Sequence, residues 1–152
     1  ASHFAPRLLL QAVELYRQNF RPSAQLDRPY VMIGVPLAAA PTDEEAEYLA
    51  SSQYQRVLGI LSGQRGLLPP PVAGFMEQLP AQHRAAILDF LAAGVIGGPA
   101  VVREGLLRLV ELTGADELML VCDIHDPALR LRALDIAAQA LADAFPQPAL
   151  AS

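Results

Sequence analysis

A glycine-rich turn in the second half of the sequence has the composition of a site where the backbone approaches a ligand. The run GVIGGP at residues 94–99 stands between an apolar segment and a predicted helix. Gly97 and Gly98 would let the backbone come close to a ligand, and the N-terminus of the following helix favours a phosphate group. The run departs from the GxGxxG fingerprint because position 99 is proline, and the chain has no lysine for a P-loop. The alternative is a tight turn that packs a helix on a strand.

A second candidate is the run CDIHD at residues 122–126, just past the C-terminal end of another apolar segment. Asp123 and His125 have the chemistry of an acid/base pair or of two metal ligands. The alternative is that Asp126 caps a helix and His125 is an ordinary loop residue. A metal site would need a third ligand, and only two other histidines are present. The sequence therefore predicts no metal site.

A third candidate lies at the start of the chain, where Ser2 and His3 precede Phe4 and a predicted helix. A histidine beside an aromatic ring could stack on a planar ligand or form a hydrogen bond with it. The alternative is an ordinary terminal histidine. The sequence contains no GxSxG, no HExxH and no defensible Ser/His/Asp or Cys/His pattern, so the catalytic residues stay unassigned. This lack fits a protein whose chemistry resides in a cofactor.

Composition limits the class of protein. The chain has 152 residues, of which 53% are hydrophobic and 18% charged, which indicates one domain with a substantial core. The net charge of -5 without a basic run argues against nucleic-acid binding. The single Cys122 excludes an internal disulfide and favours a reducing cytoplasm. No apolar run approaches the roughly 18 residues that span a bilayer, and no signal peptide is predicted.

The elements that position these candidates are read from hydrophobic periodicity and from turn residues. Helices are predicted over 7–20, 42–63, 80–93, 99–113 and 126–144, and strands over 30–35, 93–98 and 115–122. Residues 62–79 are expected to be irregular, with an extended PPP segment at 69–71 that either serves a function or is a surface excursion. Because of Pro36 and Pro41, strand pairing is not expected to continue far beyond residue 35. Residues 115–122 are expected to be the clearest buried strand. In the helix over 80–93, Ile87, Leu88 and Leu91 are expected to face inward.

Strands that alternate with helices predict an α/β fold built from parallel βαβ units with right-handed crossovers. Three strands with two open edges make a poor closed domain. Residues 1–145 are therefore interpreted as part of a (β/α)8 TIM-type barrel, its C-terminal half, and residues 146–152 as a flexible tail. The lack of a methionine at position 1 is what we expect of a processed chain or of a piece of a longer one.

Several short segments together match one family pattern. They are 1–6, 20–23 with 26–35, 42–46, Gly97-Gly98-Pro99 with Val102 and Leu106, 114–119, and Asp126 with Arg130-Leu131-Arg132. Taken together, they resemble the C-terminal half of luciferase-like flavin monooxygenases, the bacterial-luciferase type of (β/α)8 barrel. The resemblance covers nearly the whole chain, although each motif is short.

The resemblance implies a flavin-dependent oxidoreductase in which reduced FMN, supplied by a separate reductase, reacts with oxygen and a small organic substrate is oxidised. A deazaflavin is the other cofactor that the resemblance allows. By their position at the carboxyl ends of strands, Ser2, His3, Gly97 and Gly98 are the implied cofactor-binding residues. The family's N-terminal half is absent and is the implied partner, so the chain alone is expected to be inactive and to bind free FMN weakly or not at all.

Two other functions remain open on the sequence. One is a non-enzymatic α/β interaction module that forms a homodimer through its open sheet edge. The other is a hydrolase or transferase barrel that uses Asp123 and His125. Neither nucleic acid nor membrane is an expected partner in any of these functions.

Overall fold

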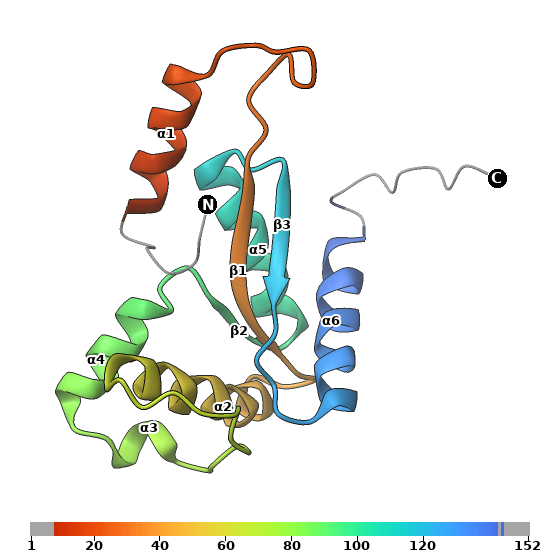
Figure 1. Cartoon of the computed structure of the whole chain (residues 1–152). Coiled ribbons are helices and arrows are strands. Elements are labelled where there is room, and N and C mark those ends of the chain that lie inside the picture. Colours follow the sequence, from red (N-terminus) through yellow and green to blue (C-terminus); the bar gives the residue numbers. More distant parts are fainter. Residues whose placement is uncertain (1–7, 143, 145–152) are drawn as a thin grey trace.

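The computed structural model describes residues 8–142 and 144 of the chain (Figure 1). Within these residues, each of the three strands is followed by a helix. In chain order the elements are α1 (Leu9–Asn19), β1 (Met32–Ala39), α2 (Asp43–Leu61), α3 (Phe75–Gln78), α4 (Ala81–Phe90), β2 (Val95–Gly97), α5 (Pro99–Thr113), β3 (Glu117–Val121) and α6 (Pro127–Leu141). The predicted order of elements is confirmed. The short α3, inside the segment predicted to be irregular, is an addition. Ser2, His3 and the predicted tail lie outside the described residues.

The described strands form one open parallel sheet with the order β2-β1-β3. β1 pairs with β3 over residues 32–36 and with β2 over residues 37–39. Parallel strands that alternate with helices are the architecture predicted for part of a barrel, so the fold class is confirmed. In a barrel with strands in chain order, however, β3 would adjoin β2. Here β1 lies between β2 and β3, and β2 is only three residues long.

β1 continues through Pro36 but ends at Ala39, before Pro41, so pairing does not continue far beyond the predicted run, as expected. Pro36 is opposite Val121 at the last position of the β1–β3 ladder, and the β1–β2 ladder begins at Leu37. Proline lacks the N–H that a continuous ladder uses. Pro36 is the position where β1 stops pairing with β3 and begins to pair with β2. A missing N–H donor disturbs the sheet least at such a position.

The helix ends follow signals in the sequence. Thr42 Oγ1 accepts a hydrogen bond from the Glu45 N–H at 3.2 Å, and Asp126 Oδ1 accepts from two N–H groups in the first turn of α6. Gly114, with φ +58°, ends α5 in the left-handed conformation. The predicted capping box at α2 is only half formed, because the Glu45 carboxylate instead pairs with Arg132 of α6. That ion pair ties two helices together that are far apart in the sequence.

The core surrounds β1, whose Ile33, Val35 and Leu37 are fully buried. α2 and α6 pack on β1, and α5 packs on β2 and α6. β3 is much more exposed, with Met119 53% accessible, so the prediction that it is the clearest buried strand is wrong. It is wrong because the described chain leaves one face of β3 uncovered, where Met119 lies beside Gly34 of β1.

Two helices bury less than the sequence predicts. In α4, Ile87 is buried and Leu91 just beyond it is buried, but Leu88 is exposed. In α1, only Leu9 and Val13 are buried. The other large apolar side chains of α1 and of the residue before it are exposed, namely Leu8, Leu10, Leu15 and Tyr16. Both helices therefore present apolar surface that the described chain does not cover. Among the described residues, no helix has the length and apolar character needed to cross a membrane.

Candidate functional site

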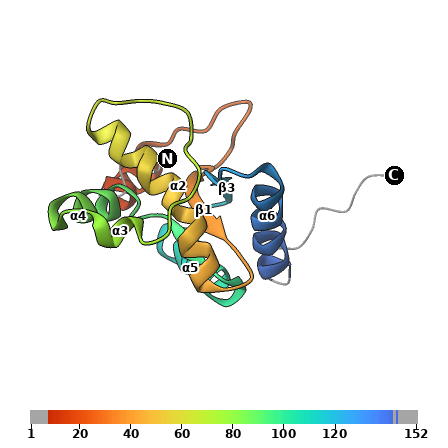
Figure 2. The same ribbon diagram turned by 90° about the horizontal axis from the view of Figure 1, so that it is seen from below.

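The carboxyl ends of the strands are the part of the molecule where the candidate residues gather. β1 and β3 both point toward α2, which crosses below their ends in Figure 1 and lies in front of them in Figure 2, the view from below. In parallel α/β folds ligands bind at this end of the sheet. The two candidate segments that the structure describes, at 94–99 and 122–126, both lie here, as predicted.

The glycine turn after β2 is occupied by a side chain of the protein itself. The Gly98 N–H donates a hydrogen bond to Oδ1 of Asp43 at 2.6 Å. A Cβ on Gly98 would lie 3.2 Å from the same oxygen, and a Cβ on Gly97 would lie 2.6 Å from Cγ1 of Val101. Gly97 also has a φ of +157°, at the edge of the region that favours glycine. The glycines therefore permit close packing, and the Asp43 carboxylate holds the N-terminus of α5, where an anion would bind.

Asp123 and His125 lie near each other in sequence but bind different partners. Asp123 Oδ1 accepts from Nη1 of Arg56 in α2 at 2.5 Å. His125 Nδ1 is 2.9 Å from the carbonyl oxygen of Leu68. Because a carbonyl oxygen only accepts, this bond requires the proton on Nδ1. The structure does not bring the two side chains together as an acid/base pair. Asp123 instead connects the end of β3 to α2, and His125 connects it to the loop at Leu68.

The loop at 62–74 is fastened to α2 and forms one wall of a cleft. Gln55 Nε2 donates to the Pro70 carbonyl oxygen at 2.9 Å, and the Val72 N–H donates to Oγ of Ser51 at 2.8 Å. The cleft beside it has a volume of about 830 Å³, in the range of small-molecule sites. Its walls combine apolar side chains with two guanidinium groups: Leu58, Ile60, Phe75, Phe90, Arg56 and Arg65.

A smaller cavity of about 90 Å³ adjoins this cleft beneath α2. It shares Arg56, Ile60 and Phe90 with the cleft and reaches Asp123 at the end of β3. Gln53 lines it and is 3% exposed. The Gln53 Oε1 atom is buried and has no hydrogen-bond partner among the described residues. A buried acceptor without a donor is costly, so this atom is an unfavourable feature of the packing beneath α2.

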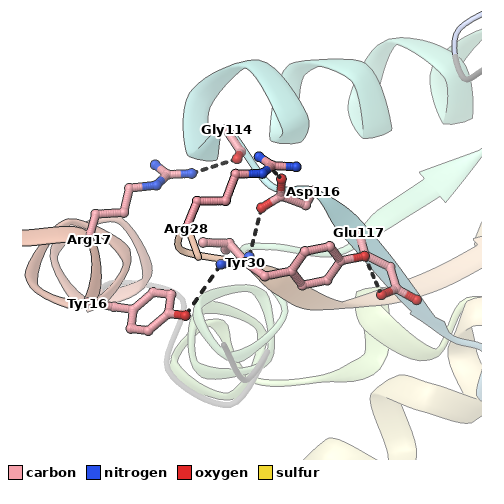
Figure 3. Close-up of polar contacts among 8 residues, drawn as sticks. Tyr16, Arg17, Arg28, Tyr30, Gly114, Asp116 and Glu117 are labelled. Carbon is pink, nitrogen blue, oxygen red and sulfur yellow. Dashed lines mark hydrogen bonds and ion pairs between the residues drawn. The ribbon is translucent and has the colours of Figure 1, made fainter. Parts of the chain in front are cut away.

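The amino ends of the strands carry a different polar cluster, drawn in Figure 3. Asp116 Oδ2 accepts from the Val31 N–H at 2.8 Å, and its Oδ1 pairs with Arg28 at 3.4 Å. The Tyr30 hydroxyl donates to Glu117 at 3.0 Å. These contacts join the start of β1 to the start of β3.

The same cluster holds α1 in place. Arg17 donates to the Gly114 carbonyl oxygen at 2.6 Å, and the Tyr16 hydroxyl accepts from the Tyr30 N–H at 3.4 Å (Figure 3). Each of these polar side chains is bonded to another part of the fold. In barrels this end of the strands contributes stability, and the opposite end contributes chemistry.

Three side chains have pKa values shifted by their surroundings, and the first is Tyr30, whose pKa is raised by its hydrogen bond to Glu117. Burial, and then the neighbouring Glu47 carboxylate to which its hydroxyl donates at 2.9 Å, raise the pKa of Tyr54. Burial also raises the pKa of the Cys122 thiol, which argues against a reactive thiolate there. Within residues 8–142 and 144, no group of three His, Cys, Asp or Glu side chains is placed to hold a metal ion.

Sequence reasoning missed three residues of this region: Asp43, Gln53 and Arg56. All three belong to the helix predicted over 42–63, where charged and amide side chains are ordinary surface residues. Asp43 was interpreted only as part of a helix start. Nothing in the sequence indicated that this helix lies across the carboxyl ends of the strands, and no local pattern could have done so.

An open parallel sheet whose strands alternate with helices is the architecture of part of a TIM-type (β/α) barrel. No family model matches the chain. The luciferase-like monooxygenase of Escherichia coli (strain K12) is 37% identical over 137 residues, which are 90% of this chain and 41% of that protein. The uncharacterized protein YvbT of Bacillus subtilis (strain 168) is 39% identical over 138 residues, 91% of this chain and 41% of that protein.

The crystal structure of apo-MsnO8 matches 96% of this chain and 45% of its own, with a TM-score of 0.73 and 27% sequence identity. The chain therefore corresponds to the C-terminal part of a longer luciferase-like protein. It spans 41% of the length of the curated relatives described above.

Proposed function

We propose that the longer protein is a flavin-dependent monooxygenase that acts on a small organic substrate with reduced FMN and oxygen in the cytoplasm. The observation that supports this most is the 37% identity with a luciferase-like monooxygenase over nine-tenths of the chain. Flavin supplies the oxygen chemistry when bound, and the protein supplies binding and orientation. A deazaflavin is the alternative cofactor in this proposal.

The proposed flavin contacts at Gly97 and Gly98 do not fit a phosphate group as the turn stands. The Asp43 carboxylate accepts the Gly98 N–H at 2.6 Å, and it would repel a second anion at the same helix end. Flavin phosphate binding at α5 would require Asp43 to move away. The other proposed contacts, Ser2 and His3, lie outside the described residues.

The proposed partner of this chain is the N-terminal part of the longer protein. Its expected docking surface is the exposed side of β3 together with the apolar face of α1, both of which the described chain leaves uncovered. Without that part the flavin site is incomplete. The 152-residue chain alone is therefore proposed to be inactive and to bind free FMN more weakly than micromolar.

The test compares the longer protein with the 152-residue chain. An intact mass of freshly expressed protein well above 16.3 kDa identifies the longer form. We expect this form to bind FMN and, with a separate reductase, to consume oxygen beyond the rate of free reduced flavin. No oxygen consumption above that rate would contradict the monooxygenase. Micromolar or tighter binding of FMN by the 152-residue chain would contradict the incomplete site.

A second proposed function is a non-enzymatic module that self-associates through its open edge. It is favoured by the exposure of β3, where Met119 is 53% accessible on an edge strand. Sedimentation equilibrium of the chain and of Met119→Lys distinguishes this function. A dimer that dissociates on substitution supports the module, and a monomer in both cases contradicts it.

A further inference from the structure

We propose that residues 63–74, between α2 and α3, form a strap that opens as a unit and is held closed by the side chain of His125. In the structure the strap crosses α2, in front of this helix in Figure 2, and it separates two clefts. Opening would join the two clefts into one groove along α2. This inference goes beyond the proposed flavin chemistry, because none of the hydrogen bonds described for the strap involves the glycine turn at 94–99.

The two clefts lie on opposite sides of the strap and differ in character. One is the 830 Å³ cleft that has Phe75 and Phe90 in its walls. The other has a volume of about 460 Å³ and is lined by three glutamates and two tyrosines. α2 lines both clefts, and the strap contributes residues 64–67 to the first and residues 72–74 to the second. The strap is therefore the partition between them.

Hydrogen bonds hold the middle of the strap in place. Ser51 and Gln55 of α2 form the two bonds to the strap that are described above. From the segment after β3, His125 Nδ1 donates to the carbonyl oxygen of Leu68 at 2.9 Å. This last bond connects the strap to the carboxyl end of the sheet, so a single exposed side chain outside α2 keeps the strap closed.

The strap contributes no residue to the core. None of residues 63–74 is buried, and the side chain of Leu67 is 97% exposed. Opening therefore breaks hydrogen bonds that water can replace and removes no side chain of the strap from the core. Segments with few buried apolar contacts open locally far more often than the whole domain unfolds.

A glycine at each end of the strap is suited to act as a hinge. Gly63 follows the end of α2 with φ +72°, and Gly74 precedes α3 with φ +64°. A Cβ on Gly63 would have no atom within 4 Å, and a Cβ on Gly74 would lie 3.6 Å from Nε2 of Gln78. Gly97 differs, because a Cβ there would lie 2.6 Å from Val101. Close packing therefore does not fix the backbone angles at the two ends of the strap, where hinges are usually found.

The experiment measures opening in the 152-residue chain by native-state amide hydrogen exchange. The Val72 N–H, which donates to Ser51, reports on the strap, and the N–H of the fully buried Leu106 inside α5 reports on global unfolding. We expect Val72 to exchange at least about 100-fold faster than Leu106. The Val72 rate should stay constant up to about 1 M urea, because local opening exposes little surface.

Variants at position 125 test the role of the histidine. His125→Ala removes the donor and should raise both the exchange rate of Val72 and the rate of trypsin cleavage after Arg65 about tenfold. His125→Asn should keep both rates near their original values, because the amide nitrogen of asparagine is bonded to Cγ as Nδ1 is and can donate the same bond. The matched control is His83→Ala, which removes an exposed histidine from α4 and should change neither rate.

The joining of the clefts is measured with the uncharged fluorescent probe N-phenyl-1-naphthylamine. If the probe binds the open groove, its apparent affinity is proportional to the fraction of molecules that are open. We therefore expect His125→Ala to bind the probe about tenfold more tightly, by the same factor as the rise in Val72 exchange. His125→Asn and His83→Ala should bind it as the original chain does.

Three results would overturn the proposal. The first is Val72 exchange that equals Leu106 exchange in rate and in urea dependence, because the strap would then open only on global unfolding. The second is a rise in Val72 exchange that is as large in His125→Asn or His83→Ala as in His125→Ala. The third is unchanged probe binding in His125→Ala. None of these measurements involves flavin or oxygen, so the flavin proposal stands or falls separately.

Discussion

β1 and β3 are neighbouring parallel strands with similar apolar sequences, yet they lie in very different surroundings. β1 has a strand on each side and helices over it, so Ile33 and Val35 have no accessible surface. β3 has β1 on one side only, and Met119 remains half exposed. The apolar composition of a segment therefore indicates a strand, whereas its place in the sheet decides how much of it is buried.

The difference also indicates how the longer protein would use each strand. β1 pairs with β3 over residues 32–36 and with β2 over residues 37–39, and its core-facing side chains are covered within this chain. β3 presents apolar surface that only additional chain could cover. If this interpretation is correct, substitutions in the two strands should have effects of very different size.

The largest expected effect is on β1. Ile33→Ala should reduce the free energy of unfolding by about 2–5 kcal/mol, since it removes a fully buried side chain and leaves a cavity. Met119→Ala on β3 should change it by less than about 1 kcal/mol. Urea unfolding followed by circular dichroism measures both. Equal losses in the two variants would contradict the contrast between the strands.

The next effect concerns the contact that joins the two strands at their amino ends. Asp116→Ala should cost about 1–3 kcal/mol, because it leaves the Val31 N–H without its acceptor at 2.8 Å. Asp116→Asn keeps an acceptor oxygen and should cost less. Arg28→Ala should cost at most about 1 kcal/mol, because Arg28 is 73% exposed. The same urea experiment applies, and a loss in Arg28→Ala as large as in Asp116→Ala would show that the ion pair matters more than the backbone bond.

A smaller, pH-dependent effect is expected from Tyr54 on the helix at the carboxyl ends. Its pKa is raised in the folded chain, first by burial and then by Glu47. The stability that depends on the neutral hydroxyl is therefore fully present below about pH 10, the value for an unfolded tyrosine, and is lost as the pH rises above it. Thermal unfolding between pH 8 and 11 should show a fall in stability that Tyr54→Phe reduces. The control Tyr48→Phe, at an exposed position, should keep the full fall.

The smallest effect concerns Cys122, directly after β3. Because burial raises the pKa of its thiol, alkylation by iodoacetamide at pH 8 should be slower than for an unfolded cysteine. Comparing the rates with and without urea measures this protection. A rate in the folded chain equal to the rate in urea would mean that the end of β3 is as open as its middle.

The sequence predicts most elements because their signals are local. Thr42, Asp126 and Gly114 mark helix ends through bonds or backbone angles that depend only on nearby residues. The errors concern long-range features. β3 is more exposed than its apolar sequence predicts, and Leu88 is exposed because nothing in the described chain covers that face of α4.

In the candidate site, too, local features could be predicted from the sequence and long-range contacts could not. The sequence determined that the runs at 94–99 and 122–126 follow strands, because hydrophobic runs and turn residues are local patterns. Only the tertiary structure decided that Asp43 occupies the glycine turn and that Arg56 reaches Asp123. These contacts join residues 55 to 67 positions apart, or depend on α2 lying across the ends of the strands. No local propensity specifies that placement, because it is set by the packing of α2 against β1 and β2.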